Sequence, residues 1–328
     1  MSSSSRSGEL TGLPDSNSYR EPTQKSLLRR VWAIRMLYLM FLPAIVYFLV
    51  FQYAPMFGVL IAFQQYNPFL GIRGSTWVGF RQFSQLFSDP YFYVLLRNTL
   101  ILSVYATVFG FPFPILFALL LNEVRFSAPK RLIQTITFFP YFVSTAVAVG
   151  MLYTLLSPHS GLVNVALGRL FGMDPIFFMA RPRYFRALYV ILSIWRRFGY
   201  VAIIYLAAMA AIDPCLYEAG EVDGIGRFRR MWNITLPGIS NTVVILLILE
   251  MGGLLTVGTE LILLMYNPST YPVADVIQTY VYRRGFGVGG FPNHSYAAAV
   301  GLFNSVIAML LVITANLLAR RYTEARLF

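Results

Sequence analysis

Long apolar runs separated by short polar stretches dominate the chain. Six of them cover approximately residues 36–54, 99–121, 132–155, 187–211, 239–263 and 296–318. Each run is close to the roughly 20 residues that an α-helix needs to cross the hydrocarbon core of a bilayer. Prolines inside the runs are tolerated, because neighbouring groups in a helix bundle can satisfy the freed carbonyls. The pattern therefore predicts an all-α membrane protein with six transmembrane helices.

Composition supports a membrane protein and defines the polar N-terminal segment. Of the 328 residues, 57% are hydrophobic and only 12% are charged, whereas soluble domains carry about 25% charged residues. Residues 1–30 are polar and rich in Ser, with no cleavable signal peptide, and we expect a disordered cytosolic tail. Residues 31–328 then form one transmembrane domain of six helices.

Basic residues predict the orientation. The net charge is +12, with 24 Arg and 2 Lys. Residues 1–35, 122–131, 212–238 and 319–328 hold 15 of these 26 basic residues, and the longer stretches on the other side hold eight. The positive-inside rule then places both termini in the cytosol. Because the arginines alternate with apolar runs and form no soluble basic patch, no nucleic acid partner is expected.

The sequence offers no pattern typical of catalysis. It contains neither a Gly-rich loop ending in Gly-Lys-Ser/Thr nor an HExxH pair. Cys215 is the single cysteine, and His159 and His294 have no metal-ligand spacing. We therefore expect no catalytic residue, no metal site and no cofactor bound by this chain.

The predicted inner loop at residues 212–238 carries the most specific pattern. Asp213 can cap a helix that has Pro214 at its first position, and Gly224 and Gly226 end that helix before a short basic one. Physical chemistry alone gives a helix, a turn and a second helix at the cytosolic surface. A pair of interfacial helices held at lipid headgroups would also fit.

The spacing within this loop resembles the signature of permease subunits of binding-protein-dependent ABC importers. That signature is Glu-Ala-Ala, three residues, Gly, nine residues and Ile-x-Leu-Pro. The matching positions here are Glu218, Ala219, Gly220, Asp223, Gly224, Ile234, Leu236 and Pro237. The chain departs from the pattern at Gly220, where Ala is usual. Gly costs up to about 1 kcal/mol relative to Ala inside a helix, which weakens the helix slightly.

Three further segments, at residues 204–209, 266–283 and 301–305, resemble carbohydrate permeases that import oligosaccharides, and the resemblance covers roughly residues 77–321. It implies a MetI-like core in the bacterial inner membrane. It also implies a second homologous permease, two ATP-binding subunits that carry ATP and Mg, and an extracytoplasmic solute-binding protein. In such importers the loop around Glu218 is the coupling helix that docks on the ATPase, where Glu218 would pair with a basic residue.

Charged residues inside the predicted spans are the candidates for the substrate path. Glu250, Gly253, Val257 and Glu260 would share a sector of about 80° on a continuous helix. A mid-helix acid costs on the order of 3 kcal/mol in lipid, so these acids should not face lipid. Either they pair with an arginine from another helix or they line a water-filled sugar path.

Span four supplies Trp195, Arg196, Arg197 and Tyr200. A guanidinium suits a carboxylate, either that of a membrane glutamate or that of a uronic acid. The aromatic rings could pack on sugar faces. We therefore expect a path for oligosaccharides, with acidic ones as the hypothesis. A proton-coupled secondary transporter and a structural membrane scaffold are the alternatives, although neither explains the spacing from Glu218 to Pro237.

Overall fold

The computed structural model describes residues 35–255, 257–288 and 290–322. The predicted tail at residues 1–30 lies outside the described residues. The chain divides into two compact units, one ending at Phe57 and the other beginning at Gly58.

The described part of the first unit is one apolar helical stretch. It consists of α2 (Arg35–Phe48), the π-helical turn η1 (Leu49–Tyr53) and α3 (Ala54–Met56). With the 3₁₀ helix η2 (Phe57–Phe63), it forms the first candidate span, Arg35–Phe63. Its large apolar side chains are exposed, for example 80% at Met40, as expected where lipid is the solvent.

In the second unit, three more helices are long and apolar enough to span a membrane. They are the stack of α6 (Pro90–Gly110) on α7 (Pro112–Asn122), then α11 (Pro182–Ala210), and finally α19 (His294–Tyr322), whose spanning part is His294–Leu317. Two bent pairs complete the six predicted segments. The first is Ser127–Phe142 with Thr145–Leu155, and the second is Arg227–Gly238 with Ser240–Gly252. The all-α architecture predicted from the sequence is confirmed.

The third predicted span is broken rather than straight. Helix α8 (Ser127–Phe138) passes into the 3₁₀ turn η3 (Phe139–Phe142), and α9 (Thr145–Leu155) then leaves at 102°. Pro140 lies in η3, and Ser144 caps α9 by accepting a hydrogen bond from the backbone N–H of Val147. A proline followed by an N-cap residue ends one helix and begins another.

The fifth predicted span is also interrupted, which corrects the expectation of a continuous helix over residues 239–263. Helix α15 covers Ser240–Gly252, and α16 begins only at Thr259 and ends at Met265. The break starts at the Gly252–Gly253 pair, and glycine is the least favourable helix residue after proline.

Short elements form the connections. Those in one group are a two-stranded antiparallel ladder, in which Gln64 pairs with Trp77, and six short helices. These elements are β1 (Gln64–Gln65), α4 (Gly71–Gly74), β2 (Thr76–Trp77), α5 (Arg81–Ser88), α10 (Leu162–Phe171), η4 (Phe178–Ala180), α17 (Tyr271–Ala274) and α18 (Ile277–Phe286). The loop at residues 212–238 consists of α12 (Pro214–Val222), α13 (Arg227–Arg230), the π-helical turn η5 (Met231–Thr235) and α14 (Leu236–Gly238).

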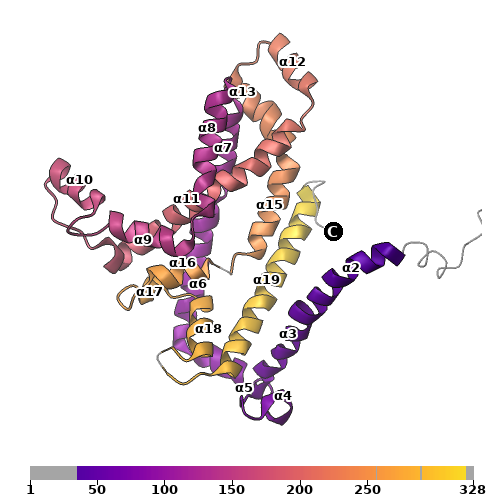
Figure 1. Ribbon diagram of the computed structural model, residues 1–328, viewed down its shortest axis with the longest axis vertical. Coiled ribbons are helices and arrows are strands. Elements are labelled where there is room, and N and C mark those ends of the chain that lie inside the picture. Colours follow the sequence, from indigo (N-terminus) through magenta and orange to yellow (C-terminus); the bar gives the residue numbers. More distant parts are fainter. Residues whose placement is uncertain (1–34, 256, 289, 323–328) are drawn as a thin grey trace, which may run out of the picture. The chain divides into compact units, whose positions relative to one another are not determined.

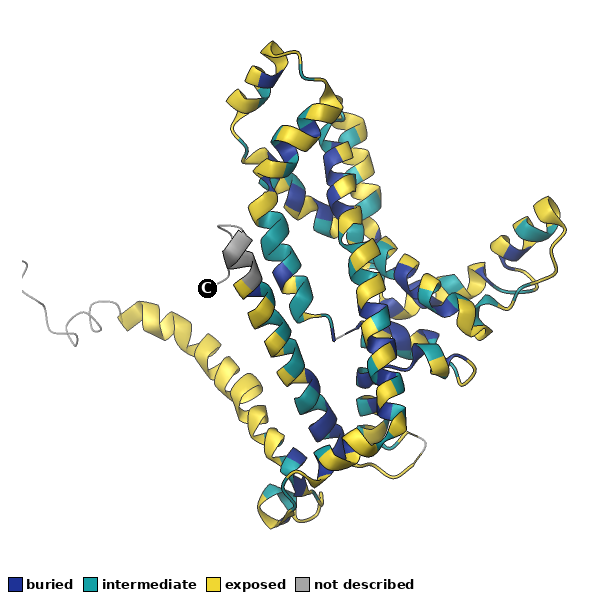
Figure 2. Cartoon of the chain, turned by 180° about the vertical axis from the view of Figure 1, so that it is seen from behind, coloured by how far each residue is buried: buried dark blue, intermediate teal, exposed yellow. Residues whose placement is uncertain are grey.

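Among the described residues, two of the three buried apolar clusters of the second unit lie along α11. One buried cluster joins it to α6, α9 and α16, and another joins it to α7 and to the segment after α13. Figure 2 shows these buried residues as dark patches within mostly exposed helices. Within this unit α12 and α13 lie at one end of the long helices and α17 and α18 toward the other (Figure 1). The loop at residues 212–238 is therefore at the opposite end of the long helices from α17 and α18.

Candidate functional site

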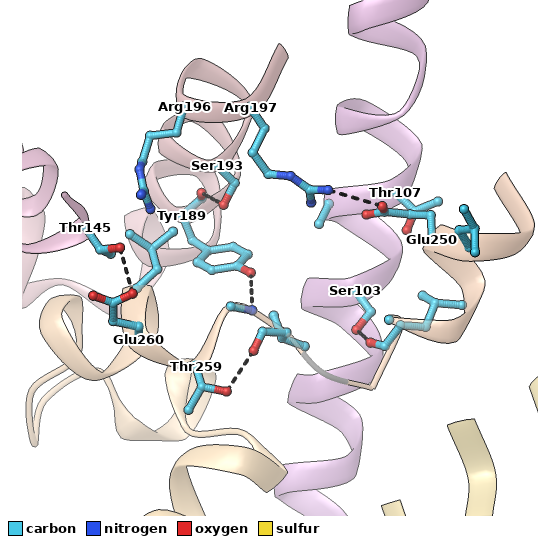
Figure 3. Close-up of a pocket in the computed structure, with 17 residues that line it drawn as sticks. Ser103, Thr107, Thr145, Tyr189, Ser193, Arg196, Arg197, Glu250, Thr259 and Glu260 are labelled. Carbon is cyan, nitrogen blue, oxygen red and sulfur yellow. Dashed lines mark hydrogen bonds and ion pairs between the residues drawn. The ribbon is translucent and has the colours of Figure 1, made fainter. Parts of the chain in front are cut away.

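A polar pocket of about 480 Å³ lies among the interrupted helices. Figure 3 shows its polar side chains converging from α6, α9, α11, α15 and α16. The polar lining consists of Ser103, Thr107, Thr145, Tyr189, Ser193, Arg196, Arg197, Glu250, Thr259 and Glu260. Its volume is within the range of roughly 300–1,000 Å³ that is typical of ligand sites.

The break after α15 brings Glu250 and Glu260 to the same pocket. The predicted shared helix face is wrong, because residues 253–255, 257 and 258 are not helical and the two acids stand on different helices. Backbone groups freed by the break find partners on neighbouring helices. The Gly258 N–H donates to the Tyr189 hydroxyl oxygen at 3.1 Å, and the Ser103 hydroxyl donates to the Leu254 carbonyl. These bonds stabilise irregular backbone at the pocket wall.

Arg197 and Glu250 form a loose ion pair across the pocket, with Nη2 and Oε2 3.5 Å apart. The side chain of Arg197 is 61% exposed and that of Glu250 is 34% exposed. A guanidinium carries five N–H donors, so one long contact leaves most of the Arg197 fork available to another acceptor. Of the two alternatives that the sequence left open for the acids, pairing with an arginine from another helix is thus observed for Glu250. The pair lies in a pocket rather than in a closed core.

Glu260 has a different partner. Its Oε2 accepts a hydrogen bond from the Thr145 hydroxyl at 2.8 Å. Thr145 is 5% exposed and stands in the first turn of α9, directly after the 102° bend. The bend before α9 therefore places the Thr145 hydroxyl where it can donate to Glu260, which lies on α16 just after the break that follows α15.

Arg196 supports the bend. Its Nη2 donates to the Val143 carbonyl at 3.3 Å, which satisfies a carbonyl freed where η3 ends. Three residues later Gly199 lets α11 approach α8, since a Cβ built there would lie 2.0 Å from the Thr137 carbonyl oxygen. Arg196 Nε is buried and has no hydrogen-bond partner among the described residues. This arginine therefore lines the pocket and stabilises the bend that forms part of its wall.

Trp195 and Tyr200 do not line this pocket. Trp195 is 36% exposed, and Tyr200 stacks on Tyr141 with ring centroids 4.1 Å apart and an interplanar angle of 7°. The structure thus brings four of the six candidate path residues together, the two arginines and the two glutamates, and leaves the two aromatic residues on other surfaces.

The sequence-based prediction missed the residues that contribute hydroxyl groups to the pocket lining. Tyr189, Ser193 and Arg197 follow each other at intervals of four along α11, which places them on one helix face. A polar stripe at this spacing inside an apolar helix was the available signal. Thr145 and Ser103 had no such signal, because they reach the pocket only through tertiary packing.

In the loop at residues 212–238, the structure has the expected helix, turn and helix. The Cys215 N–H donates to Asp213 Oδ1 at 2.9 Å at the start of α12, and Gly224 has φ of +70° after its end. Gly220 is buried, and a Cβ there would meet Ile234 Cδ1 at 3.0 Å. Glycine at this position therefore lets α12 pack closely on the returning segment.

The remaining signature residues differ in how far they are exposed. Glu218, Ala219, Asp223 and Pro237 are exposed, whereas Ile234 and Leu236 are partly buried. Exposed apolar side chains also lie on α12 and at its end, with Leu216 at 53% and Val222 at 88%. An exposed surface with both acidic and apolar groups is suited to docking on another protein.

Comparison with known proteins gives consistent matches over most of the chain. Residues 110–324 match the family model of the binding-protein-dependent transport system inner membrane component. The polygalacturonan/rhamnogalacturonan transport system permease protein YteP of Bacillus subtilis is 44% identical over 314 residues, which cover 96% of this chain and 97% of the relative.

Two solved structures are also similar. A chain of a bacterial alginate ABC transporter in complex with an alginate pentasaccharide-bound periplasmic protein is 40% identical, with a TM-score of 0.85 and coverage of 92% of this chain and 100% of that one. A second, from a bacterial ABC transporter that imports the acidic polysaccharide alginate, is 41% identical, with a TM-score of 0.84 and the same coverage. This chain therefore belongs to the family of inner membrane components of binding-protein-dependent transport systems, as a multi-pass permease of the ABC type.

Proposed function

We propose that this chain is one of two membrane-spanning subunits of an ATP-driven importer that takes up acidic, uronate-containing oligosaccharides by alternating access. The similar proteins support this substrate class, since one is named for polygalacturonan and rhamnogalacturonan and the others for alginate. Family membership favours an importer over a proton-coupled secondary transporter or a membrane scaffold.

The Arg197 guanidinium carries the proposal for an acidic substrate. It is 61% exposed in a pocket of about 480 Å³ and contacts Glu250 through a single 3.5 Å contact. A uronate carboxylate would form shorter, charge-assisted bonds with the free edge of this fork. The hydroxyls of Ser193 and Thr107, which line the same pocket, would bind sugar oxygens.

We further propose the assembly that the resemblance implies. A second homologous permease would complete the translocation path, and two ATP-binding subunits would hold ATP and Mg, with no cofactor on this chain. A solute-binding protein would deliver the sugar, which fits the periplasmic protein named in the alginate transporter structure. Both termini would be cytosolic, and the exposed Glu218 would contact the ATPase from the coupling loop.

Uptake by the purified importer in proteoliposomes, with its binding protein and ATP, tests the substrate class. We expect ATP-dependent uptake of trigalacturonate that excess maltotriose does not inhibit. Arg197→Gln should reduce trigalacturonate uptake about 10-fold or more, since a hydrogen bond to a charged group contributes about 1.5–3 kcal/mol. Arg131→Gln removes the same charge from an exposed position outside the pocket and should leave uptake within about twofold. Preference for maltotriose would refute the acidic substrate.

The coupling role of the loop requires its own experiment. Glu218→Lys and Gly224→Asp should leave a complex that assembles but lacks ATPase stimulation by the loaded binding protein. Wild-type stimulation and uptake in both variants would show that this loop does not couple the two activities.

A further inference from the structure

An ion-pair network joins the coupling loop to another span. Arg230 on α13 places Nη1 2.7 Å from Oε1 of Glu221 on α12, and Nη2 3.4 Å from Oε2 of Glu123. Glu123 is the C-cap of α7, at the cytosolic end of the second span in the proposed orientation. Among the described residues, this is the one ion pair that connects residues 212–238 to a helix outside the loop.

The two contacts of Arg230 differ in burial. The side chains of Arg230 and Glu123 are 17% and 15% exposed, whereas that of Glu221 is 69% exposed. Exposed pairs contribute little because water and salt screen them, but removing one member of a largely buried pair leaves the other without compensation. The contact between Arg230 and Glu123 is therefore the one that holds the loop to α7 more strongly, although its N–O distance is the longer of the two.

The loop itself is braced around the same arginine. The Arg230 guanidinium lies 5.7 Å from the ring centroid of Tyr217, and the Tyr217 hydroxyl is 3.1 Å from the Thr235 hydroxyl. Tyr217 and Glu221 are four residues apart on α12, so both face the returning segment. Arg230 thus holds α12, α13 and the end of α7 as one body.

The span that this ion pair reaches at α7 lines the pocket through its other part, α6. Helix α7 continues α6 as one span, Pro90–Asn122, whose Ser103 and Thr107 line the polar pocket. The chain itself connects the loop only to α11 and to α15. Without a lateral tie, movement of the loop would reach the second span only through apolar packing.

We propose that Arg230 is a positioning residue that transmits movement of the coupling loop to the second span through Glu123. This inference rests on the proposed function, because it takes the loop as the part that the ATPase moves. It adds the route by which that movement reaches the α6 wall of the pocket.

Variants of Arg230 and of its two glutamate partners test this transmission in the complete importer. In proteoliposomes supplied with trigalacturonate and binding protein, we expect Glu123→Gln and Arg230→Gln to assemble and to hydrolyse ATP at the basal rate, while sugar transported per ATP falls about fivefold or more. Glu221→Gln removes the same charge from the exposed contact with the same arginine, and it should keep the ratio within about twofold. Wild-type ratios in Glu123→Gln and Arg230→Gln would overturn the proposal.

A second measurement separates this route from the substrate assignment and from a merely structural role. With Cys215→Ser removing the single cysteine, spin labels at Val222 and Leu120, both exposed, report the distance between α12 and α7. In the otherwise wild-type importer this distance should stay the same with and without ATP and vanadate, and in Arg230→Gln it should change on ATP addition. An unchanged distance in Arg230→Gln would refute the tie. The two proposals can fail separately. If the wild-type importer does not transport trigalacturonate but the distances between the labels are as expected, the substrate proposal is refuted and the link through Arg230 and Glu123 is not.

Discussion

Asp275 is the centre of a charged cluster at the end of the long helices opposite the loop at residues 212–238. Its side chain is fully buried and accepts hydrogen bonds from the hydroxyls of Tyr91 and Thr279, each at 2.6 Å, and from Arg283. Arg283 is 15% exposed and lies 4.7 Å from the ring centroid of Tyr271. Burial disfavours the charged form of Arg283, but the bond and the attraction to Asp275 outweigh it, so the pKa of Arg283 is raised. The cluster therefore depends on the negative charge of Asp275.

Asp275→Asn keeps the shape of the side chain and removes only that charge. Removing one partner of a buried ion pair destabilises by about 3–5 kcal/mol. At roughly 2 °C per kcal/mol for a chain of this size, the melting temperature should fall by about 6–10 °C. Fluorescence-detected size exclusion of the heated, tagged importer measures this shift.

Two controls make the measurement specific to the buried charge. Asp174→Asn is the same chemical change at an exposed position and should change stability by no more than about 0.5 kcal/mol. The double variant Asp275→Asn with Arg283→Gln should recover part of the loss, because most of the destabilisation comes from the uncompensated guanidinium. If Asp275→Asn has the same melting temperature as the Asp174→Asn control, Asp275 does not compensate the charge of Arg283, and the reasoning is refuted.

Three further substitutions test the other structural arguments. Gly199→Ala should destabilise the importer by about 2 kcal/mol or more, because its Cβ would clash with the Thr137 carbonyl, whereas Gly150→Ala on α9 meets nothing within 4 Å and should not; melting curves compare them. Gly224→Ala should reduce binding-protein-stimulated ATPase activity, because φ of +70° costs an L-residue about 1–2 kcal/mol, while Gly226→Ala, at φ of −64°, should be tolerated; equal activities would contradict the turn argument. Arg197→Gln should change the melting temperature by no more than about 2 °C despite its effect on uptake, because its ion pair is exposed; a large loss would make the arginine structural.

The apolar pattern predicted the number and type of the spans because lipid imposes both the length and the helical form of a spanning segment. Local rules also predicted the loop correctly, with Asp213 as the cap of α12 and glycines after its end. These features depend on neighbouring residues alone, and a single sequence contains that information.

The interruptions of the spans were harder to predict. The helical spacing of Glu250 and Glu260 matched a single face, and hydropathy does not distinguish a continuous helix from one that breaks at Gly252–Gly253. The break is stable because Tyr189 and Ser103, from two other helices, bind its freed backbone groups. Partners that are 69 and 151 residues away in the chain cannot be identified from local patterns.

The two interruptions also explain why adjacent arginines have different roles. The bend at Val143 leaves a carbonyl for Arg196, and Thr145, just beyond it, binds Glu260. The break after α15 leaves Glu250 at the end of a helix, where it reaches Arg197. Because successive residues on a helix point about 100° apart, Arg196 faces the bend and Arg197 faces the open pocket. A substitution at Arg196 should therefore disturb the backbone that forms the pocket, whereas one at Arg197 should leave that backbone in place and remove only a charge that faces the open pocket.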